Sequence, residues 1–73
     1  MVIRKISIGA DYKSSMNYIV GQDVINNSHK IHEITTTNEG WFYVWIISHS
    51  KEVVKWKAFS PTMPVSVEYN IDF

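Results

Sequence analysis

The segment Trp41–Ile47 is a run of seven apolar or aromatic residues, Trp-Phe-Tyr-Val-Trp-Ile-Ile. A strand with one face in water alternates apolar and polar side chains, and this run contains no polar one. Both faces of the strand that it predicts must therefore be covered. The protein core covers one face, and a ligand, a partner subunit or a second layer of the chain must cover the other. A second layer is difficult to supply in a chain of 73 residues, so the run indicates binding or assembly.

The length of the chain predicts a single domain, residues 1–73, that needs additional stabilisation. A domain of this size buries only about 60% of the surface that its unfolded chain exposes. Disulfides, structural metal ions and oligomerisation are the usual remedies. The chain has no cysteine, which excludes disulfides and the commonest zinc frameworks and fits a reducing compartment. We therefore expect a homo-oligomer.

The charges of the chain cancel, with seven Lys or Arg residues against seven Asp or Glu residues. No overall field attracts nucleic acid or an anionic membrane, so we expect no long nucleic acid as partner. The N-terminal residues Met1–Ile6 carry Arg4 and Lys5 where a signal peptide would be apolar, and no apolar run approaches the roughly 18 residues of a membrane span. These features predict a cytoplasmic protein without a membrane partner.

Short segments rich in β-branched and aromatic residues alternate with turn residues, which predicts an all-β fold, a small β-meander barrel or sandwich. Residues 11–20 also fit one short helix, although the composition of Met16–Val20 favours a strand. From Lys30 onward the strands should form a meander. The expected strands are Val2–Ile8, Met16–Val20, Lys30–Thr36, Trp41–Ile47, Glu52–Phe59 and a last strand on which Val65, Val67, Tyr69 and Ile71 alternate with polar residues and face the core.

Three connectors carry turn chemistry. Asn26 and Asn27 favour a loop because asparagine tolerates left-handed backbone conformations. Gly40 suits the left-handed position of a hairpin loop. Pro61 and Pro64 forbid a central strand between them.

Alternation along the strands assigns the side chains to faces. The smaller side chains of the aromatic run fit a close-packed interior, so we expect an inner set of Phe42, Val44, Ile46, Val54 and Trp56. Lys55 and Lys57 mark the wetter face. The outward surface then consists of Trp41, Tyr43, Trp45, Lys55 and Lys57, a combination that can stack a planar base and neutralise a phosphate. Aromatic residues on a strand more often pack in a core or between subunits, and a pocket between subunits would serve both purposes.

The sequence predicts no catalytic residue, no metal ligand and no cofactor. It contains no nucleophile elbow, phosphate-binding glycine loop or carboxylate pair. His29 and His32 are three residues apart on a predicted strand, so their rings fall on opposite faces, and His49 lies in a later loop. We expect all three to be solvated or hydrogen-bonded, and Lys51 to be a solubilising surface charge.

Four segments resemble small accessory proteins of large T-even-type tailed phages: Gly9–Lys13, Asn17–Gln22, Trp56–Phe59 and Met63–Phe73. Such proteins often act on the host, and some are oligomeric sponges that sequester nucleotide signals made by bacterial immune systems. The resemblance implies a stoichiometric counter-defence binder in the host cytoplasm. It assigns no site residues.

The leading hypothesis is a non-enzymatic homo-oligomer that binds a small nucleotide-like immune signal between aromatic side chains. The alternative is an interaction protein that docks the same aromatic surface on a host protein and inhibits a host enzyme.

Overall fold

The structure, a computed structural model, describes residues 2–9 and 15–70, and these form seven strands and no helix. The predicted all-β fold is therefore confirmed. Residues 16–19 form a strand, and residues 11–14 of the alternative helix lie outside the described residues. None of the described segments is a helix that could cross a membrane. The strands are β1 (Val2–Ile8), β2 (Met16–Ile19), β3 (Asp23–Val24), β4 (His29–Thr36), β5 (Phe42–Ser48), β6 (Val53–Phe59) and β7 (Val65–Asn70).

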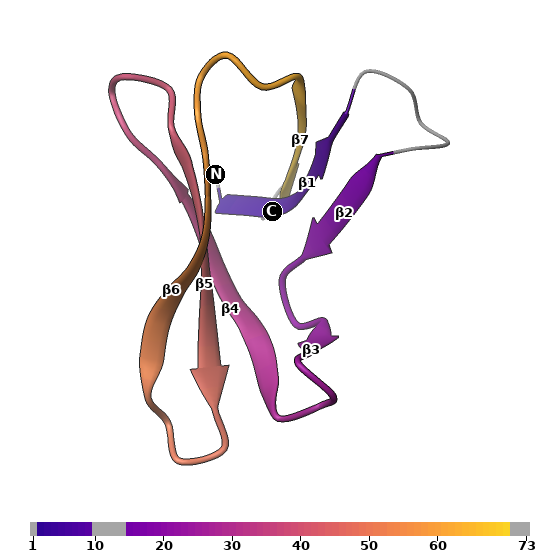
Figure 1. Cartoon of the computed structure of the whole chain (residues 1–73), viewed down its shortest axis with the longest axis vertical. Helices are drawn as coiled ribbons and strands as arrows, with labels where there is room; N and C mark the ends of the chain where they lie inside the picture. Colours follow the sequence, from indigo (N-terminus) through magenta and orange to yellow (C-terminus); the bar gives the residue numbers. More distant parts are fainter. Residues whose placement is uncertain (1, 10–14, 71–73) are drawn as a thin grey trace.

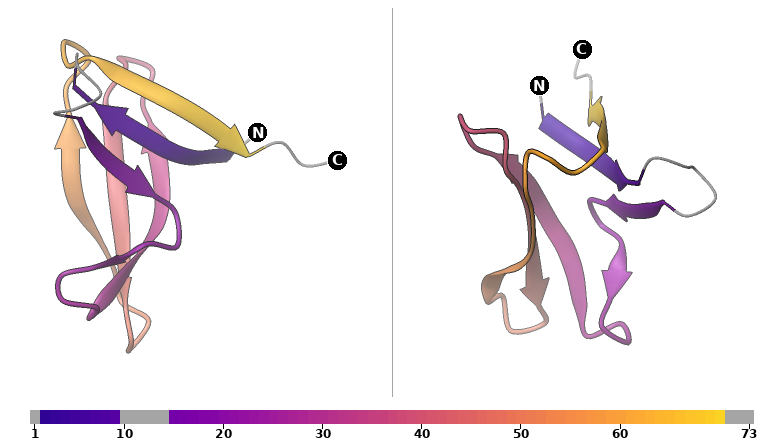
Figure 2. Two further views of the ribbon diagram at one scale, coloured as in Figure 1. Left: turned by 90° about the vertical axis from the view of Figure 1, so that its right-hand side faces the viewer. Right: turned by 45° about the horizontal axis from the view of Figure 1, so that its top comes forward.

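The strands form two antiparallel sheets, a three-stranded sheet of order β2-β1-β7 and a four-stranded sheet of order β3-β4-β5-β6. Figure 1 shows the arrangement, and the left view of Figure 2 shows the smaller sheet crossing the upper part of the larger one obliquely. The two sheets therefore face one another over only part of their length.

The segment from β2 to β3 acts as one bent strand that joins the two sheets. Val20 N–H donates to the Arg4 carbonyl in the first sheet, and Gly21 N–H donates to the Ile31 carbonyl in the second. Ile31 N–H in turn donates to the Gln22 carbonyl. Gly21 has φ +93°, a conformation that costs glycine little, and this allows the bend.

The predicted meander is correct for β4, β5 and β6 but wrong for β7. That strand leaves the meander and pairs with β1 of the other sheet. The connector with Pro61 and Pro64 carries the chain across, because proline cannot donate to a sheet ladder. Gly9 N–H donates to the Pro64 carbonyl at 2.9 Å and sets the start of β7 beside the end of β1.

A β-bulge interrupts the pairing on each of β1, β4 and β6. The extra residues, which have no partner in the register, are Arg4, His32 and Trp56. A bulge places two residues opposite one and bends the strand. It also changes the spacing of inward side chains from two residues to three, as at Ile31 and Ile34, which are both buried. The bulges thus curl the sheets around the core.

The core consists of eight buried residues from β1, β2, β4 and β5, and none of the described polar residues is buried. Partly buried side chains of β3, β5, β6 and β7 pack around it. Phe42, Val44, Ile46 and Trp56 lie inside as predicted. The eight residues are Ile3, Ile6, Ile8, Tyr18, Ile31, Ile34, Val44 and Ile46.

Two residues predicted to lie inside are exposed instead. Val54 pairs with Ile46 and shares its face, yet 47% of Val54 is exposed. Tyr69 is 48% exposed. Both residues lie on edge strands beyond the region where the sheets overlap, and Figure 2 shows the end of β7 projecting past the larger sheet. Alternation predicted their faces correctly, but no opposing layer reaches them. Ile71 lies outside the described residues.

Three aromatic side chains join β2 to β6 across the space between the sheets. The ring centroid of Tyr18 lies 5.9 Å from that of Trp56, edge to face, and 5.4 Å from that of Phe59. Such pairs contribute about 0.5–1.5 kcal/mol beyond the area that they bury. These ring contacts hold β6 against the smaller sheet, with which it shares no backbone pairing.

Val44 and Val54 lie on the inner face but differ in burial, so a valine-to-alanine substitution should lower the free energy of unfolding by different amounts at the two positions. Val44→Ala should lower the free energy of unfolding by about 2–3 kcal/mol, because Val44 is fully buried and its loss leaves a cavity. Val54→Ala should change it by less than about 1 kcal/mol, because Val54 is already half in water. Urea unfolding measures both values, and equal losses would contradict the assigned burial.

Tyr18 predicts a loss of stability at alkaline pH. Burial raises the pKa of the Tyr18 phenol above its ordinary value of 10.0. The folded protein therefore keeps a proton that the unfolded chain has lost, so the stabilisation is complete below pH 10 and declines as the pH rises through the raised pKa.

Unfolding measured between neutral pH and about pH 11 should show a smaller alkaline decline in Tyr18→Phe than in the unmodified protein. Tyr69→Phe is the matched control, since Tyr69 is exposed, and should leave the decline unchanged. An identical profile for all three proteins would contradict the role of Tyr18.

Candidate ligand-binding site

The outer face of β5 presents Tyr43, Trp45 and Ile47, because Val44 and Ile46 between them point into the core. These three side chains are half-buried. Their neighbours follow from the register: Thr35 and Ala58 flank Tyr43, and Glu33 and Lys55 flank Trp45. The side chains that flank Tyr43 are small, so Lys55 is the long side chain beside its ring.

Lys55 lies against both rings of this face. Its Nζ atom is 4.0 Å from the Tyr43 ring centroid and 5.5 Å from that of Trp45. Both distances are within the range of a cation–π contact, which contributes about 0.5–1 kcal/mol at an exposed site. The structure thus brings together three of the five predicted site residues, and we call Tyr43, Trp45 and Lys55 the β5 platform.

The indole of Trp45 is held in place from the neighbouring strand. Its Nε1–H donates to Thr35 Oγ1 at 2.9 Å, and both residues are half-buried. A tryptophan with its polar atom bound and its ring facing outward is restricted to few rotamers. A ligand that stacks on it therefore loses less conformational entropy of the protein on binding.

The prediction that Lys57 lies beside Lys55 on the outer face is wrong. The bulge at Trp56 shifts the register, so that Lys57 pairs with buried Val44 and Lys55 pairs with outward Trp45. Phe59 moves to the inner face for the same reason and packs against the core. Lys57 Nζ instead lies 4.9 Å from the Trp56 ring centroid.

Trp41 precedes β5 and belongs to the hairpin loop. Its N–H donates to Thr37 Oγ1, and its carbonyl accepts from Thr37 N–H. Gly40 has φ +94°, as the loop prediction required, and an added Cβ there would approach the Pro61 side chain to 3.1 Å. Trp41 is 38% exposed and lies at the end of the platform strand rather than over Lys55.

A polar hollow of about 130 Å³ lies at the other end of β5, where Ile47 forms part of its wall. The rest of the lining is basic or hydroxylic, with no carboxylate. The sequence interpretation missed this hollow, which we call the loop-end pocket. The signal that could have found it is the set of basic residues at the ends of two adjacent predicted strands. Its polar lining residues are Ser28, His29, Lys30, Ser48, His49 and Lys51.

Within the described ranges, no group of three His, Asp or Glu side chains is placed to hold a metal ion. His29 and His49 form hydrogen bonds within the protein, in agreement with the expectation for the histidines. His32 is the extra residue of the β4 bulge and is exposed.

No known protein family, no curated protein and no solved structure matches this chain.

The hydrogen bond from Trp45 predicts the effect of a conservative change at Thr35. Thr35→Val keeps the shape but removes the acceptor, so the free energy of unfolding should fall by about 1 kcal/mol and the Trp45 indole N–H should exchange faster with solvent. NMR of the indole protons measures this directly. Thr36→Val, on the exposed opposite side of β4, should leave the Trp45 signal unchanged; an unchanged signal in Thr35→Val would contradict the role of the bond.

Proposed function

We propose that the protein is a non-enzymatic binding protein for a small nucleotide-derived ligand and that it acts as a homo-oligomer. The observation that carries the proposal is the β5 platform, in which one ammonium group lies against two outward aromatic rings. The resemblance to T-even-type phage accessory proteins implies which ligand this is, an immune signal that the protein sequesters in the host cytoplasm.

The chemistry of the platform suits a nucleotide. Stacking of a base on an aromatic side chain contributes about 1–3 kcal/mol to the free energy of binding, and every base can stack because each has a flat aromatic face. Lys55 is a flexible cation that can leave the Tyr43 ring, because the contact it would lose is worth only about 0.5–1 kcal/mol and a charge-assisted hydrogen bond to a phosphate is stronger.

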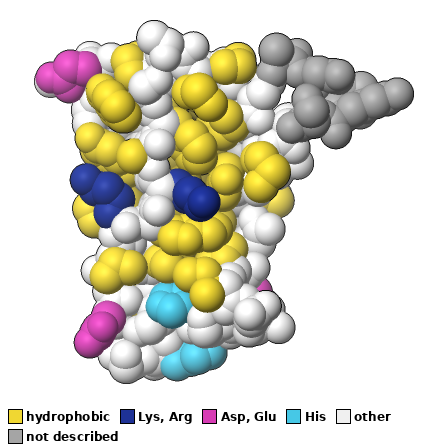
Figure 3. Space-filling view, in the orientation of Figure 1, with side chains coloured by type: hydrophobic (Ala, Val, Ile, Leu, Met, Phe, Trp, Pro, Cys, Tyr) yellow, Lys and Arg dark blue, Asp and Glu magenta, His cyan; other side chains and the backbone are white. Residues whose placement is uncertain are grey.

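The exposed apolar surface supports an oligomer. Nine large hydrophobic residues of the described ranges are exposed, among them Val53, Val54 and Trp41. Figure 3 shows hydrophobic side chains over much of one face, with Lys or Arg side chains among them and acidic side chains at its margin. A small domain with so much apolar surface gains stability when a second copy covers it.

The second candidate is a protein that docks on a host enzyme and inhibits it. The observation in its favour is that the platform is an open surface formed by one strand and its neighbours, and Tyr and Trp are enriched in protein interfaces. A host partner would bury the same two rings.

Calorimetry and tryptophan fluorescence with a panel of mono-, di- and cyclic nucleotides separate the two candidates. A nucleotide binder should show heat of binding and quenching, and Trp45→Ala should weaken affinity roughly 5- to 150-fold. Lys57→Ala should have little effect because Lys57 lies over Trp56.

Native mass spectrometry of the protein purified from infected cells tests assembly and detects retained ligand in the same experiment. A mass of 8.5 kDa at all concentrations would contradict the oligomer. No response to any nucleotide, on protein free of retained ligand, together with one host partner whose capture is lost in Trp45→Ala, would favour the inhibitor.

A further inference from the structure

The loop-end pocket borders the outer face of β5 that carries the β5 platform. Lys30 and Ile47 are a cross-strand pair, and Ile47 follows Trp45 by two residues on the outer side of β5. Two residues of a strand span about 6.6 Å. The pocket therefore begins about one sugar unit away from the indole on which a base would stack.

The polar lining of the pocket is rich in hydrogen-bond donors and positive charge. Lys30 and Lys51 supply two ammonium groups, and no lining residue is acidic. Within residues 2–9 and 15–70, the Lys51 ammonium has no ion-pair partner. Lys51 also has φ +71°, an uncommon conformation for a residue with a side chain.

The hydrogen bonds of the two histidines determine which ring nitrogens remain available. Ser28 Oγ–H donates to the Ile25 carbonyl, so its 2.7 Å contact with His29 Nδ1 must be donated by the imidazole. The Asn27 carbonyl accepts from His49 Nε2–H at 3.2 Å. His29 Nε2 and His49 Nδ1 are therefore left to interact with a ligand. In a neutral ring this nitrogen accepts a hydrogen bond, as from a protonated phosphate oxygen, and in a charged ring it donates one.

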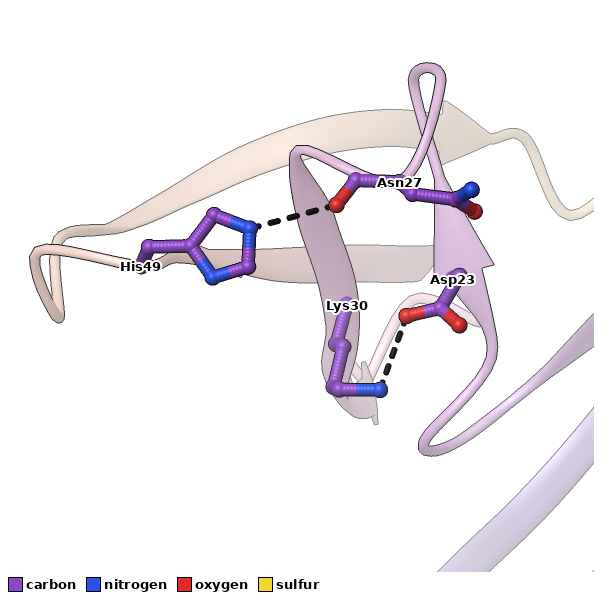
Figure 4. A network of polar contacts seen from close by, with 4 residues as sticks. All are labelled: Asp23, Asn27, Lys30 and His49. Carbon is purple, nitrogen blue, oxygen red and sulfur yellow. Dashed lines mark hydrogen bonds and ion pairs between the residues drawn. The ribbon is translucent and has the colours of Figure 1, made fainter.

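Among the residues that the structure describes, the one carboxylate bound to the lining residues is Asp23. Lys30 Nζ lies 2.7 Å from Asp23 Oδ1, and both side chains are more than half exposed. Figure 4 shows Lys30 reaching Asp23 on the neighbouring strand of the β3–β4 hairpin, and His49 reaching the backbone oxygen of Asn27 in the turn of that hairpin. An exposed ion pair is weak, so an incoming anion can share or displace Asp23 at Lys30.

From this geometry we infer that the loop-end pocket binds the phosphate group of the ligand whose base stacks on the β5 platform. The inference rests on the proposed function and deepens it, because it adds Lys30 and Lys51 to Lys55 as the cations that meet the phosphate. The hollow, of about 130 Å³, has room for one phosphate group.

NMR titration of the ¹⁵N-labelled protein with inorganic phosphate, adenosine and adenosine monophosphate tests the inference. Phosphate should shift the amide signals of Ser28, His29 and His49 to Lys51, and adenosine should shift the Trp45 indole signal. Adenosine monophosphate should shift both sets and bind more tightly than either part alone.

Three variants sharpen the test. Lys51→Ala should weaken the binding of phosphate and of adenosine monophosphate roughly 3- to 10-fold, with a smaller dependence on salt. Asp23→Asn should strengthen both roughly 2- to 5-fold, because it frees Lys30. Lys57→Ala, the matched control, should change neither.

The failure of the inference and the failure of the proposed function have different signatures. If adenosine monophosphate shifts Trp45 but Lys51→Ala and Asp23→Asn bind it like the unmodified protein, the phosphate lies elsewhere and the inference is wrong. If phosphate shifts the pocket signals and no nucleotide shifts Trp45, the pocket is an anion site and the proposed function is wrong. If neither region responds, both are wrong.

Discussion

The three β-bulges are the constraint on which the rest of this structure depends. Each one inserts an extra residue, Arg4, His32 or Trp56, into a strand that would otherwise run straight. Bulges bend strands and increase their twist. The bend allows seven short strands to enclose a core of eight buried side chains without a helix to cover either sheet. Straight sheets of this size would leave the isoleucines of β1 and β4 on alternating faces, half of them in water.

The same bulges decide the chemistry of the two faces. On β6 the extra Trp56 shifts the register, so that the exposed Lys57 pairs with Val44 and Lys55 lies on the outer side with Tyr43 and Trp45. Because β6 is an edge strand, the bulge at Trp56 also hinders pairing with another chain through the strand edge. The apolar surface that remains is formed by side chains, which favours association through faces rather than through added strands.

The ligand that we propose is planar at one end and anionic at the other, and the platform and the pocket match these two ends. β5 connects them, because it presents Tyr43, Trp45 and Ile47 on one face and is held in register by β4 and β6. The loops that carry Ser28 and Lys51 close the far end. Loops positioned by a rigid sheet are a common location for binding residues, since the sheet fixes their spacing while their side chains vary.

The sequence by itself determined the all-β fold, the existence of most strands to within one or two residues, the glycine of the hairpin loop and the division of β5 into an inner and an outer face. These features are local, because alternation and turn chemistry act over a few neighbouring residues. Long-range contacts set the remaining features: β7 pairs with β1, Lys57 pairs with Val44, Val54 and Tyr69 stay in water, and Lys51 joins His29 and His49 in one pocket. A bulge reverses every face assignment that follows it along the strand, and burial depends on how far the opposing sheet extends. The alternation of side chains along a single strand indicates neither the position of a bulge nor the extent of the opposing sheet.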